Sequence, residues 1–93
     1  MKRAVELKHA YIHRKRGVCG GRPVIRGTRF PVSAVVEYVY RLGMTPEEMV
    51  REWKHLSLAQ IHDALSYYHD HKDEIDQSIR RNNESILRKK MIG

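Results

Sequence analysis

The residues with the clearest chemical potential in this 93-residue sequence are its arginines and lysines. There are 18 of them against 11 aspartates and glutamates, which gives a formal net charge of +7. Residues 1–32 hold nine cations and one glutamate, residues 33–79 hold four cations and nine carboxylates, and residues 80–93 hold five cations and one glutamate. An acidic centre between two basic ends predicts a polyanionic partner, either nucleic acid or an acidic protein surface. The alternative is that the charge serves only solubility.

Other chemistries are poorly represented. His62 and His69 would share one helix face, but their spacing is not that of zinc ligands, so surface histidines are the better interpretation. The adjacent Glu47 and Glu48 are better explained as helix-start charges than as a catalytic pair. The sequence has no phosphate-binding loop motif, and it defines no nucleophile–base pair. We therefore predict a binding protein that is not an enzyme and that uses no catalytic residue, metal or cofactor.

Length and composition predict one domain. Cys19 is the only cysteine, which excludes an internal disulfide framework. The first residues have the charge of a signal peptide without an apolar run behind them, and no stretch approaches the roughly 18 apolar residues that span a bilayer. We expect a cytoplasmic protein.

The first third of the sequence indicates extended structure. Residues 9–13 are rich in β-formers, and glycine and proline punctuate residues 17–23 as turns. Residues 24–32 form two short apolar pieces about Gly27, which predict a small hairpin or a pair of edge strands bracketed by Pro23 and Pro31.

The rest of the sequence indicates helices. The first is expected between Ser33 and Gly43, the second over residues 46–53 after a Thr45 cap, and the third from Leu58 after a Ser57 cap with Gln60. A fourth amphipathic segment should follow a break near residues 69–72. The apolar stripes that define these helices are Val35, Val36, Val39, Tyr40 and Leu42; Met49, Val50 and Trp53; Leu58, Ile61, Ala64, Leu65 and Tyr68; and Ile75, Ile79, Ile86 and Leu87.

Short connections between the first three helices are typical of a helix-turn-helix module. In such a module the start of the third helix contacts base edges, and nearby cations contact phosphates. The candidate DNA-binding residues are Arg22, Arg26, Arg29, Arg51, Lys54, Ser57, Gln60 and His62. The third helix has no Lys or Arg, however, and Asp63 and Asp70 would repel phosphate. A three-helix core without a DNA role is therefore an open alternative.

The segment around Gly27 has two interpretations of its own. Gly27 suits a turn position with positive φ. Arg29 is either a clamp for phosphate or carboxylate, or a structural arginine that bonds loop carbonyls, and we favour the structural role because glycine and proline constrain its neighbours.

The sequence resembles the domain-of-unknown-function 433 (DUF433) family. The resemblance rests on Gly20-Gly21, Pro23, Ile25-Arg26-Gly27-Thr28-Arg29 and Pro31-Val32, and it continues through Gly43-Met44-Thr45-Pro46, Leu56-Ser57-Leu58, Ile61, Ala64-Leu65 and Tyr67-Tyr68. It covers about residues 10–76. The sequence departs from the family before His55-Leu56, where the family often has a proline, and this affects only the shape of the turn.

The resemblance implies a mainly α fold, in which a small N-terminal β hairpin precedes a three-helix, homeodomain-like helix-turn-helix core and a C-terminal helix. It also implies an antitoxin of a type II toxin–antitoxin module, which neutralises a PIN-like ribonuclease toxin and autoregulates its own transcription by binding operator DNA. We expect a homodimer, since two-fold dimers are commonest for operator binding. Val35, Val36, Val39 and Tyr40 are candidate interface residues, although they suit the core equally.

The C-terminal segment is the candidate toxin-binding element. We divide the chain into a domain of residues 1–78 and a basic helix or tail of residues 79–93. Apolar side chains would dock on the toxin, and an arginine would fill its acidic, metal-holding site. The candidate residues are Ile79, Arg80, Arg81, Ile86, Leu87 and Arg88. The alternatives are a solvated, frayed tail and, for the whole protein, a protein-interaction module without DNA binding.

Overall fold

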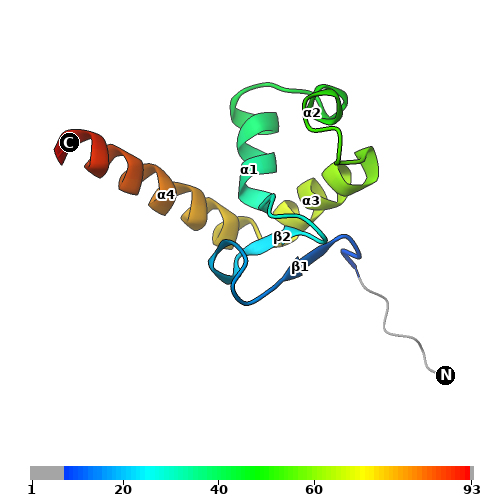
Figure 1. Cartoon of the computed structure of the whole chain (residues 1–93), viewed down its shortest axis with the longest axis horizontal. Coiled ribbons are helices and arrows are strands. Elements are labelled where there is room, and N and C mark those ends of the chain that lie inside the picture. The colour runs from blue at the N-terminus through cyan, green and yellow to red at the C-terminus, as the bar shows by residue number, and fades with distance from the viewer. Residues whose placement is uncertain (1–7, 93) are drawn as a thin grey trace.

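The computed structural model describes residues 8–92, with side chains over residues 8–82. It is mainly helical and begins with a two-stranded antiparallel sheet (Figure 1). The strands are β1 (Ile12–Arg14) and β2 (Pro23–Ile25), and the helices are α1 (Val32–Val36), α2 (Pro46–Glu52), α3 (Leu58–Asp70) and α4 (Lys72–Ile92). A π-helical turn, Glu37–Arg41, prolongs α1. The predicted fold class, a small β hairpin followed by helices, is confirmed.

The hairpin differs from the predicted one in its pairing. β2 pairs with β1, so that Ile12 lies opposite Ile25 and His13 opposite Val24, whereas residues 28–32 contribute only an isolated bridge between Val24 and Pro31. The Gly27 segment instead forms a tight turn, in which Gly27 has φ +82°. The Thr28 hydroxyl closes this turn because it donates to the Ile25 carbonyl at 2.8 Å and accepts from the Phe30 amide at 2.9 Å.

Both predicted helix caps are present. The Thr45 hydroxyl accepts from the Glu48 amide at 3.0 Å, and the Glu48 carboxylate accepts from the Thr45 amide at 2.8 Å. Ser57 and Gln60 make the same reciprocal pair at 3.2 and 2.8 Å. These bonds satisfy amides that a helix start otherwise leaves without partners, so α2 and α3 begin where the sequence indicates.

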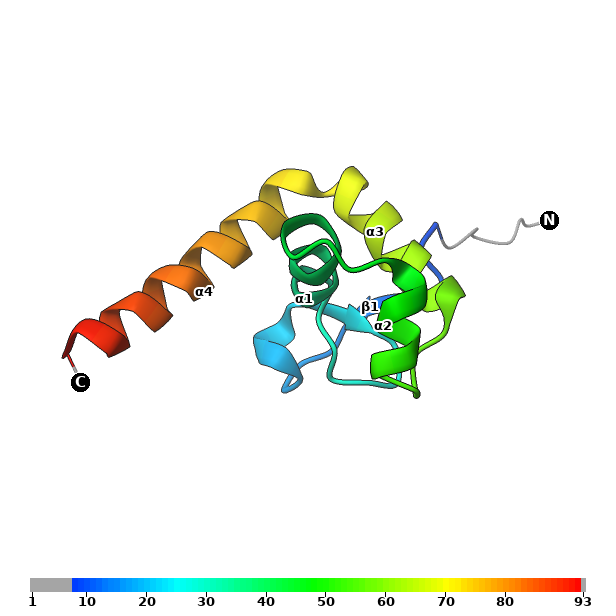
Figure 2. The same ribbon diagram turned by 90° about the horizontal axis from the view of Figure 1, so that it is seen from above.

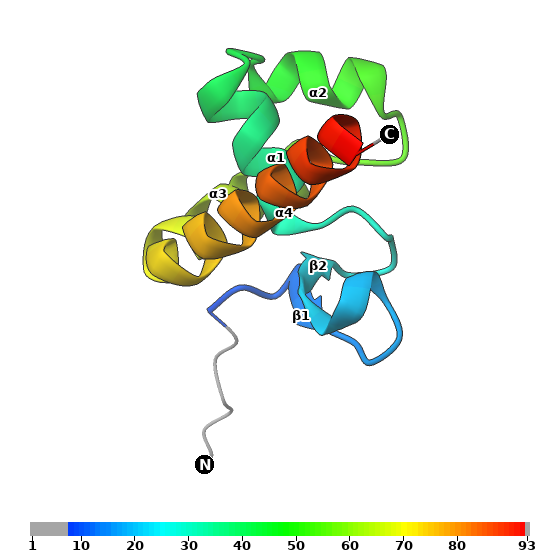
Figure 3. The same ribbon diagram turned by 90° about the vertical axis from the view of Figure 1, so that its left-hand side faces the viewer.

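The core lies around α3, which packs against α1 and α2 on one side and β1 on the other (Figures 1 and 3). Buried side chains from both strands and all four α-helices meet there, together with one from the α2–α3 turn: Ile12, Ile25, Val32, Val35, Val36, Met49, Leu56, Ile61, Ala64, Leu65, Tyr68, Ile75 and Ile79. The predicted stripe of α3 was wrong at one position, because Leu58 is the first residue of the helix and is 41% exposed. Val35 and Val36 belong to the core, whereas Tyr40 is exposed and Val39 is partly buried.

Helix α4 passes without interruption through the predicted boundary between residues 78 and 79. Its first turns pack on the core, and its backbone then runs outward from the rest of the protein (Figures 1 and 2). Over residues 8–92, no helix combines the length and the apolar character needed to cross a membrane.

Candidate nucleic-acid and partner-binding surfaces

The first surface is the turn between α2 and α3. Leu56 anchors this turn in the core, and its amide donates to the Trp53 carbonyl at 2.9 Å. Arg51, Lys54 and His62 are exposed around it. Two of the predicted DNA-binding residues, Ser57 and Gln60, bond to each other's backbone in the helix cap. Only their remaining donors, the serine hydroxyl hydrogen and the glutamine NH₂ group, are free of these cap bonds.

The second surface is formed where residues 8–11, here called the N-terminal arm, run along α3. The Asp63 carboxylate accepts from the Tyr11 amide at 2.8 Å and lies 3.1 Å from Nδ1 of His9. The Asp70 carboxylate lies 2.8 Å from Nε2 of His9 and 3.4 Å from the Lys8 ammonium. A cleft of about 380 Å³ remains between the arm and α3, and it is lined by Lys8, Ala10, Tyr11, Ala59, His62, Asp63 and Ser66.

His9 is the centre of this contact. Its side chain is only 9% exposed, and its ring meets the Tyr67 ring edge-on at a centroid distance of 5.2 Å. Both ring nitrogens of His9 face carboxylate oxygens, so the ring bridges Asp63 and Asp70. The hydrogen bond from His9, together with that from Lys8, lowers the pKa of Asp70 below its ordinary value. The arm therefore supplies hydrogen bonds to the two carboxylates of α3 that would repel phosphate, and the Lys8 ammonium lies beside Asp70.

We expect His9→Ala to lower the free energy of unfolding by about 1–3 kcal/mol, because it removes one of the two hydrogen-bond partners of a largely buried carboxylate. The side chain of Asp63 is 15% exposed and would keep only the Tyr11 amide. Chemical denaturation measures the change. His62→Ala is the matched control, because His62 is an exposed histidine on α3. It should change the free energy of unfolding little. Equal stabilities of the two variants would contradict the role assigned to His9.

The same contact predicts an acid dependence. A carboxyl group whose pKa is lowered on folding stabilises the protein fully above its ordinary pKa of 3.8, and this stabilisation is lost as the pH falls through the lowered folded value. The His9 hydrogen bond is the main cause of the lowered pKa of Asp70, and His9→Ala removes it. Below about pH 4, the wild type should therefore lose more stability than this variant. Denaturation at a series of pH values measures this difference, and parallel pH profiles would count against it.

The three predicted arginines of the hairpin region have different surroundings. Arg22 is half-buried, and its Nε donates to the Cys19 carbonyl at 3.0 Å. Arg26 is exposed, and its Nε donates to the Ala10 carbonyl at 3.2 Å. The guanidinium of Arg29 has no hydrogen-bond partner among the described residues, although its carbonyl accepts from the Cys19 thiol at 3.1 Å. The structural role that we favoured for Arg29 is therefore wrong in detail, because Arg22 and Arg26 are the arginines that bond loop carbonyls.

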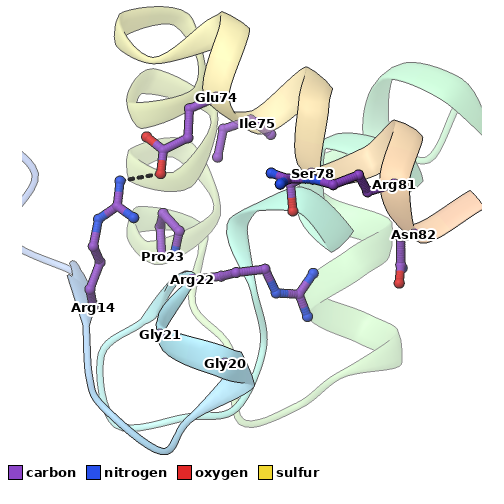
Figure 4. Close-up of a pocket in the computed structure, with 10 residues that line it drawn as sticks. All are labelled: Arg14, Gly20, Gly21, Arg22, Pro23, Glu74, Ile75, Ser78, Arg81 and Asn82. Atoms are coloured by element: carbon purple, nitrogen blue, oxygen red, sulfur yellow. Dashed lines mark hydrogen bonds and ion pairs between the residues drawn. The ribbon is translucent and has the colours of Figure 1, made fainter. Parts of the chain in front are cut away.

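A third surface lies between the loop before β2 and the start of α4 (Figure 4). It is a pocket of about 450 Å³ lined by Arg14, Gly20, Gly21, Arg22, Pro23, Glu74, Ile75, Ser78, Arg81 and Asn82. Arg14 forms an ion pair with Glu74 across it and also donates to the Tyr67 hydroxyl at 3.4 Å. Sequence patterns gave no sign that Arg22 and Arg81 would line one pocket, because they are 59 positions apart in the chain.

The predicted DNA-binding residues therefore lie on several surfaces. Arg51, Lys54, Ser57, Gln60 and His62 surround the α2–α3 turn, whereas Arg22 lies in the pocket beside α4. Arg26 adjoins the arm, and Arg29 lines a cleft of about 420 Å³ with His13 and Lys15. Sequence reasoning missed the arm, although the opposite charges of the first third and the centre were a signal for it.

The predicted toxin-binding residues are also divided. Ile79 is buried among the core residues, so its assignment to a docking surface was wrong. Arg80 and Arg81 are exposed on α4. The side chains of Ile86, Leu87 and Arg88 lie outside the part that the structure describes. Among the described residues, no three His, Cys, Asp or Glu side chains gather as a metal site would require.

Comparison with known proteins gives a consistent family assignment. The model of the family described as protein of unknown function, DUF433, matches residues 12–68. No protein of curated function matches the chain in sequence. The crystal structure of a DUF433 member protein from Anabaena variabilis is similar in fold, with a TM-score of 0.70 and 33% sequence identity. The match covers 75% of this chain and 68% of the Anabaena chain.

Proposed function

From the premise that the chain belongs to the DUF433 family of proteins of unknown function, we propose that it is the antitoxin of a type II toxin–antitoxin module. It acts in the cytoplasm by binding and not by catalysis. One partner is a PIN-like ribonuclease, encoded by a neighbouring gene, and the other is operator DNA. A homodimer provides the two-fold symmetry that such an operator requires.

The observation that carries this proposal is the length and direction of α4. Ile75 and Ile79 hold its first turns on the core, but the helix continues to Ile92 (Figure 2). A helical segment of about 10 residues is marginal in water without tertiary contacts. A protein partner that packs along this segment would supply them. In sequence the segment combines apolar Ile86 and Leu87 with the cations Arg88, Lys89 and Lys90.

The chemistry of the proposed toxin suits this segment. A PIN-like nuclease holds divalent metal with clustered carboxylates. Arginine binds carboxylates through charge-assisted, bidentate hydrogen bonds, so a helix bearing arginines can occupy such a site and exclude the substrate RNA. Arg80 and Arg81 are exposed on the part of α4 that the structure describes, which leaves both within reach of a partner.

The DNA-binding half of the proposal is supported by the α2–α3 turn. Its exposed cations, Arg51 and Lys54, lie beside the capped start of α3. The arm contacts Asp63 and Asp70 through hydrogen bonds and places the Lys8 ammonium beside Asp70, which weakens a repulsion that the sequence alone had suggested. Arg29, with an exposed guanidinium, adds a further phosphate contact.

We expect Arg29→Ala to weaken binding to the DNA upstream of its own gene and to lower the dependence of log affinity on log salt by about one. Its unfolding free energy should stay within about 0.5 kcal/mol of the wild type, as is usual for a surface substitution. Electrophoretic shifts over a salt series measure the first effect, and denaturation measures the second. Arg41→Ala is the control, since Arg41 is exposed but pairs with Glu37 at 2.6 Å. Unfolding of Arg29→Ala would restore the structural interpretation.

A second function is favoured by a specific observation. α3 carries no lysine or arginine, and the arm covers part of the face that would enter a major groove. This arrangement suits a module that binds only protein.

Co-expression with the neighbouring gene product, followed by size-exclusion chromatography and a salt-titrated DNA shift, separates the two functions. A complex that shifts DNA supports the antitoxin that autoregulates; a complex that does not shift DNA supports the protein-only module; no complex contradicts both.

A further inference from the structure

The pocket between the loop before β2 and the start of α4 has a charge and a shape that suit an anion. Three guanidinium groups and one carboxylate line it, which gives a formal charge of +2. We infer that this pocket binds the phosphate group of a nucleotide-sized ligand, held between Arg22 and Arg81. This inference does not rest on the proposed antitoxin function.

The arginines of the pocket differ in how many of their guanidinium donors are already hydrogen-bonded. Arg14 is committed to Glu74 and Tyr67, so the carboxylate in the pocket already has its cation. Arg22 uses Nε on the Cys19 carbonyl at 3.0 Å, which fixes the plane of its guanidinium. Its two terminal nitrogens have no hydrogen-bond partner among the described residues. A fixed guanidinium with free amino groups is preorganised to bind an oxyanion, because little side-chain entropy remains to be lost.

The opposite wall comes from α4. Figure 4 shows the Arg22 side chain extending from the loop toward the helix, where Ser78, Arg81 and Asn82 line the pocket. The serine hydroxyl and the asparagine amide are neutral donors, and Arg81 is exposed and long enough to adjust. Donors therefore approach the pocket from two separate elements.

This two-sided arrangement favours phosphate over carboxylate. A carboxylate is planar, and a single guanidinium fork can satisfy both of its oxygens from one side. A phosphate presents three oxygens in different directions, so it can accept from Arg22 and Arg81 at the same time. The loop wall consists of Gly20 and Gly21, at φ +66° and +80°, and a Cβ at either position would meet no atom within 4 Å. Without side chains there, a ligand can approach the loop backbone closely.

The volume of the pocket indicates a ligand larger than a free phosphate ion. Its volume of about 450 Å³ lies within the range of small-molecule sites, roughly 300–1,000 Å³. A phosphate monoester such as a mononucleotide would place its phosphate between the arginines and leave the rest of the molecule at the open side. A phosphodiester of a nucleic-acid backbone presents two non-bridging oxygens, which can accept from the same two arginines, and the experiment distinguishes the two sources.

The test is a titration of the full chain with adenosine monophosphate at constant ionic strength, followed by amide NMR. We expect saturable shifts at Gly20, Gly21 and Ser78. Arg81→Gln should weaken binding about tenfold, because it removes one charged fork, and Arg22→Lys should weaken it as well, because lysine keeps the charge without the fork. Arg41→Gln is the control and should bind like the wild type, because Arg41 is exposed and lies outside the pocket.

Shifts that do not saturate, or equal weakening by Arg81→Gln and Arg41→Gln, would overturn the site and leave only non-specific charge attraction. Circular dichroism is used to check that each variant is folded. Arg81 is exposed, so its substitution should not affect folding. A short DNA duplex is then added to the nucleotide complex. Displacement of the nucleotide assigns the pocket to backbone phosphate, and retention assigns it to a free monoester; either result supports phosphate binding.

Discussion

A chain that ends at Asn82 is expected to fold like the full chain and to lose its binding to the neighbouring nuclease. Ile75 and Ile79, which hold α4 on the core, are both retained in this chain. The segment removed is the one whose backbone runs outward from the core (Figure 1). Its loss should therefore affect a partner and not the fold. Denaturation of the truncated chain and size-exclusion chromatography of the co-expressed pair measure the two effects.

The position of the truncation decides whether a loss of nuclease binding can be separated from a loss of stability. A chain that ends at Gln77 also loses Ile79, which is only 9% exposed, and should be less stable by about 2–5 kcal/mol, as is typical when a large aliphatic side chain leaves a core. Loss of binding by that shorter chain would be uninformative because it could follow from unfolding. Retention of full nuclease binding by the chain that ends at Asn82 would refute the role of the C-terminal segment.

The substitution with the largest expected effect on stability is Ile61→Ala. Ile61 is 0% exposed and lies on the face of α3 that enters the core. Truncation of such a side chain costs about 2–5 kcal/mol, since it removes apolar contacts and leaves a cavity. A small domain has only about 5–15 kcal/mol of stability in total, so the variant should be partly unfolded at moderate denaturant concentrations. The midpoint and slope of a denaturation curve test this expectation.

Leu58→Ala is the matched control for Ile61→Ala. The two residues have the helical spacing of one apolar stripe, but Leu58 is 41% exposed at the first position of α3. Its truncation should cost less than about 1 kcal/mol, within the range of surface substitutions. If both variants lost the same stability, the packing of α3 described above would be wrong.

Local signals explain why the helices could be predicted from the sequence. The caps at Thr45 and Ser57 depend on residues three positions apart, and such short-range chemistry determines where α2 and α3 begin. The pairing of β1 with β2 could not be predicted in the same way. It joins Ile12 to Ile25 across a loop, and an apolar strand does not specify which neighbour it will pair with.

The charged surfaces were predictable only in outline. The sequence indicated a basic first third and an acidic centre, and both were interpreted as features that face external partners. The structure pairs some of these charges with each other: Lys8 with Asp70, and Arg14 with Glu74. Contacts between residues more than 50 positions apart follow from the packing of the arm and β1 on α3, which no local pattern specifies.

The arm also affects which groups would contact DNA in the proposed complex. It lies on the face of α3 that holds Asp63, so a major groove would meet the arm together with the helix. The exposed His62 lines the same cleft as Lys8 and Tyr11. Phosphate contacts would then come from the arm and the hairpin arginines, and base contacts from the few exposed polar groups at the start of α3.

Growth of cells that express the nuclease tests whether this chain neutralises the enzyme by binding it. The neighbouring nuclease gene is induced in cells that carry either this chain or an empty vector, and RNA integrity is followed alongside culture density. A nuclease variant without its metal-binding carboxylates controls for toxicity unrelated to cleavage. The antitoxin function predicts arrested growth with the vector and normal growth with intact RNA when the chain is present. Arrest and RNA cleavage in cells that contain the folded, full-length chain would contradict it.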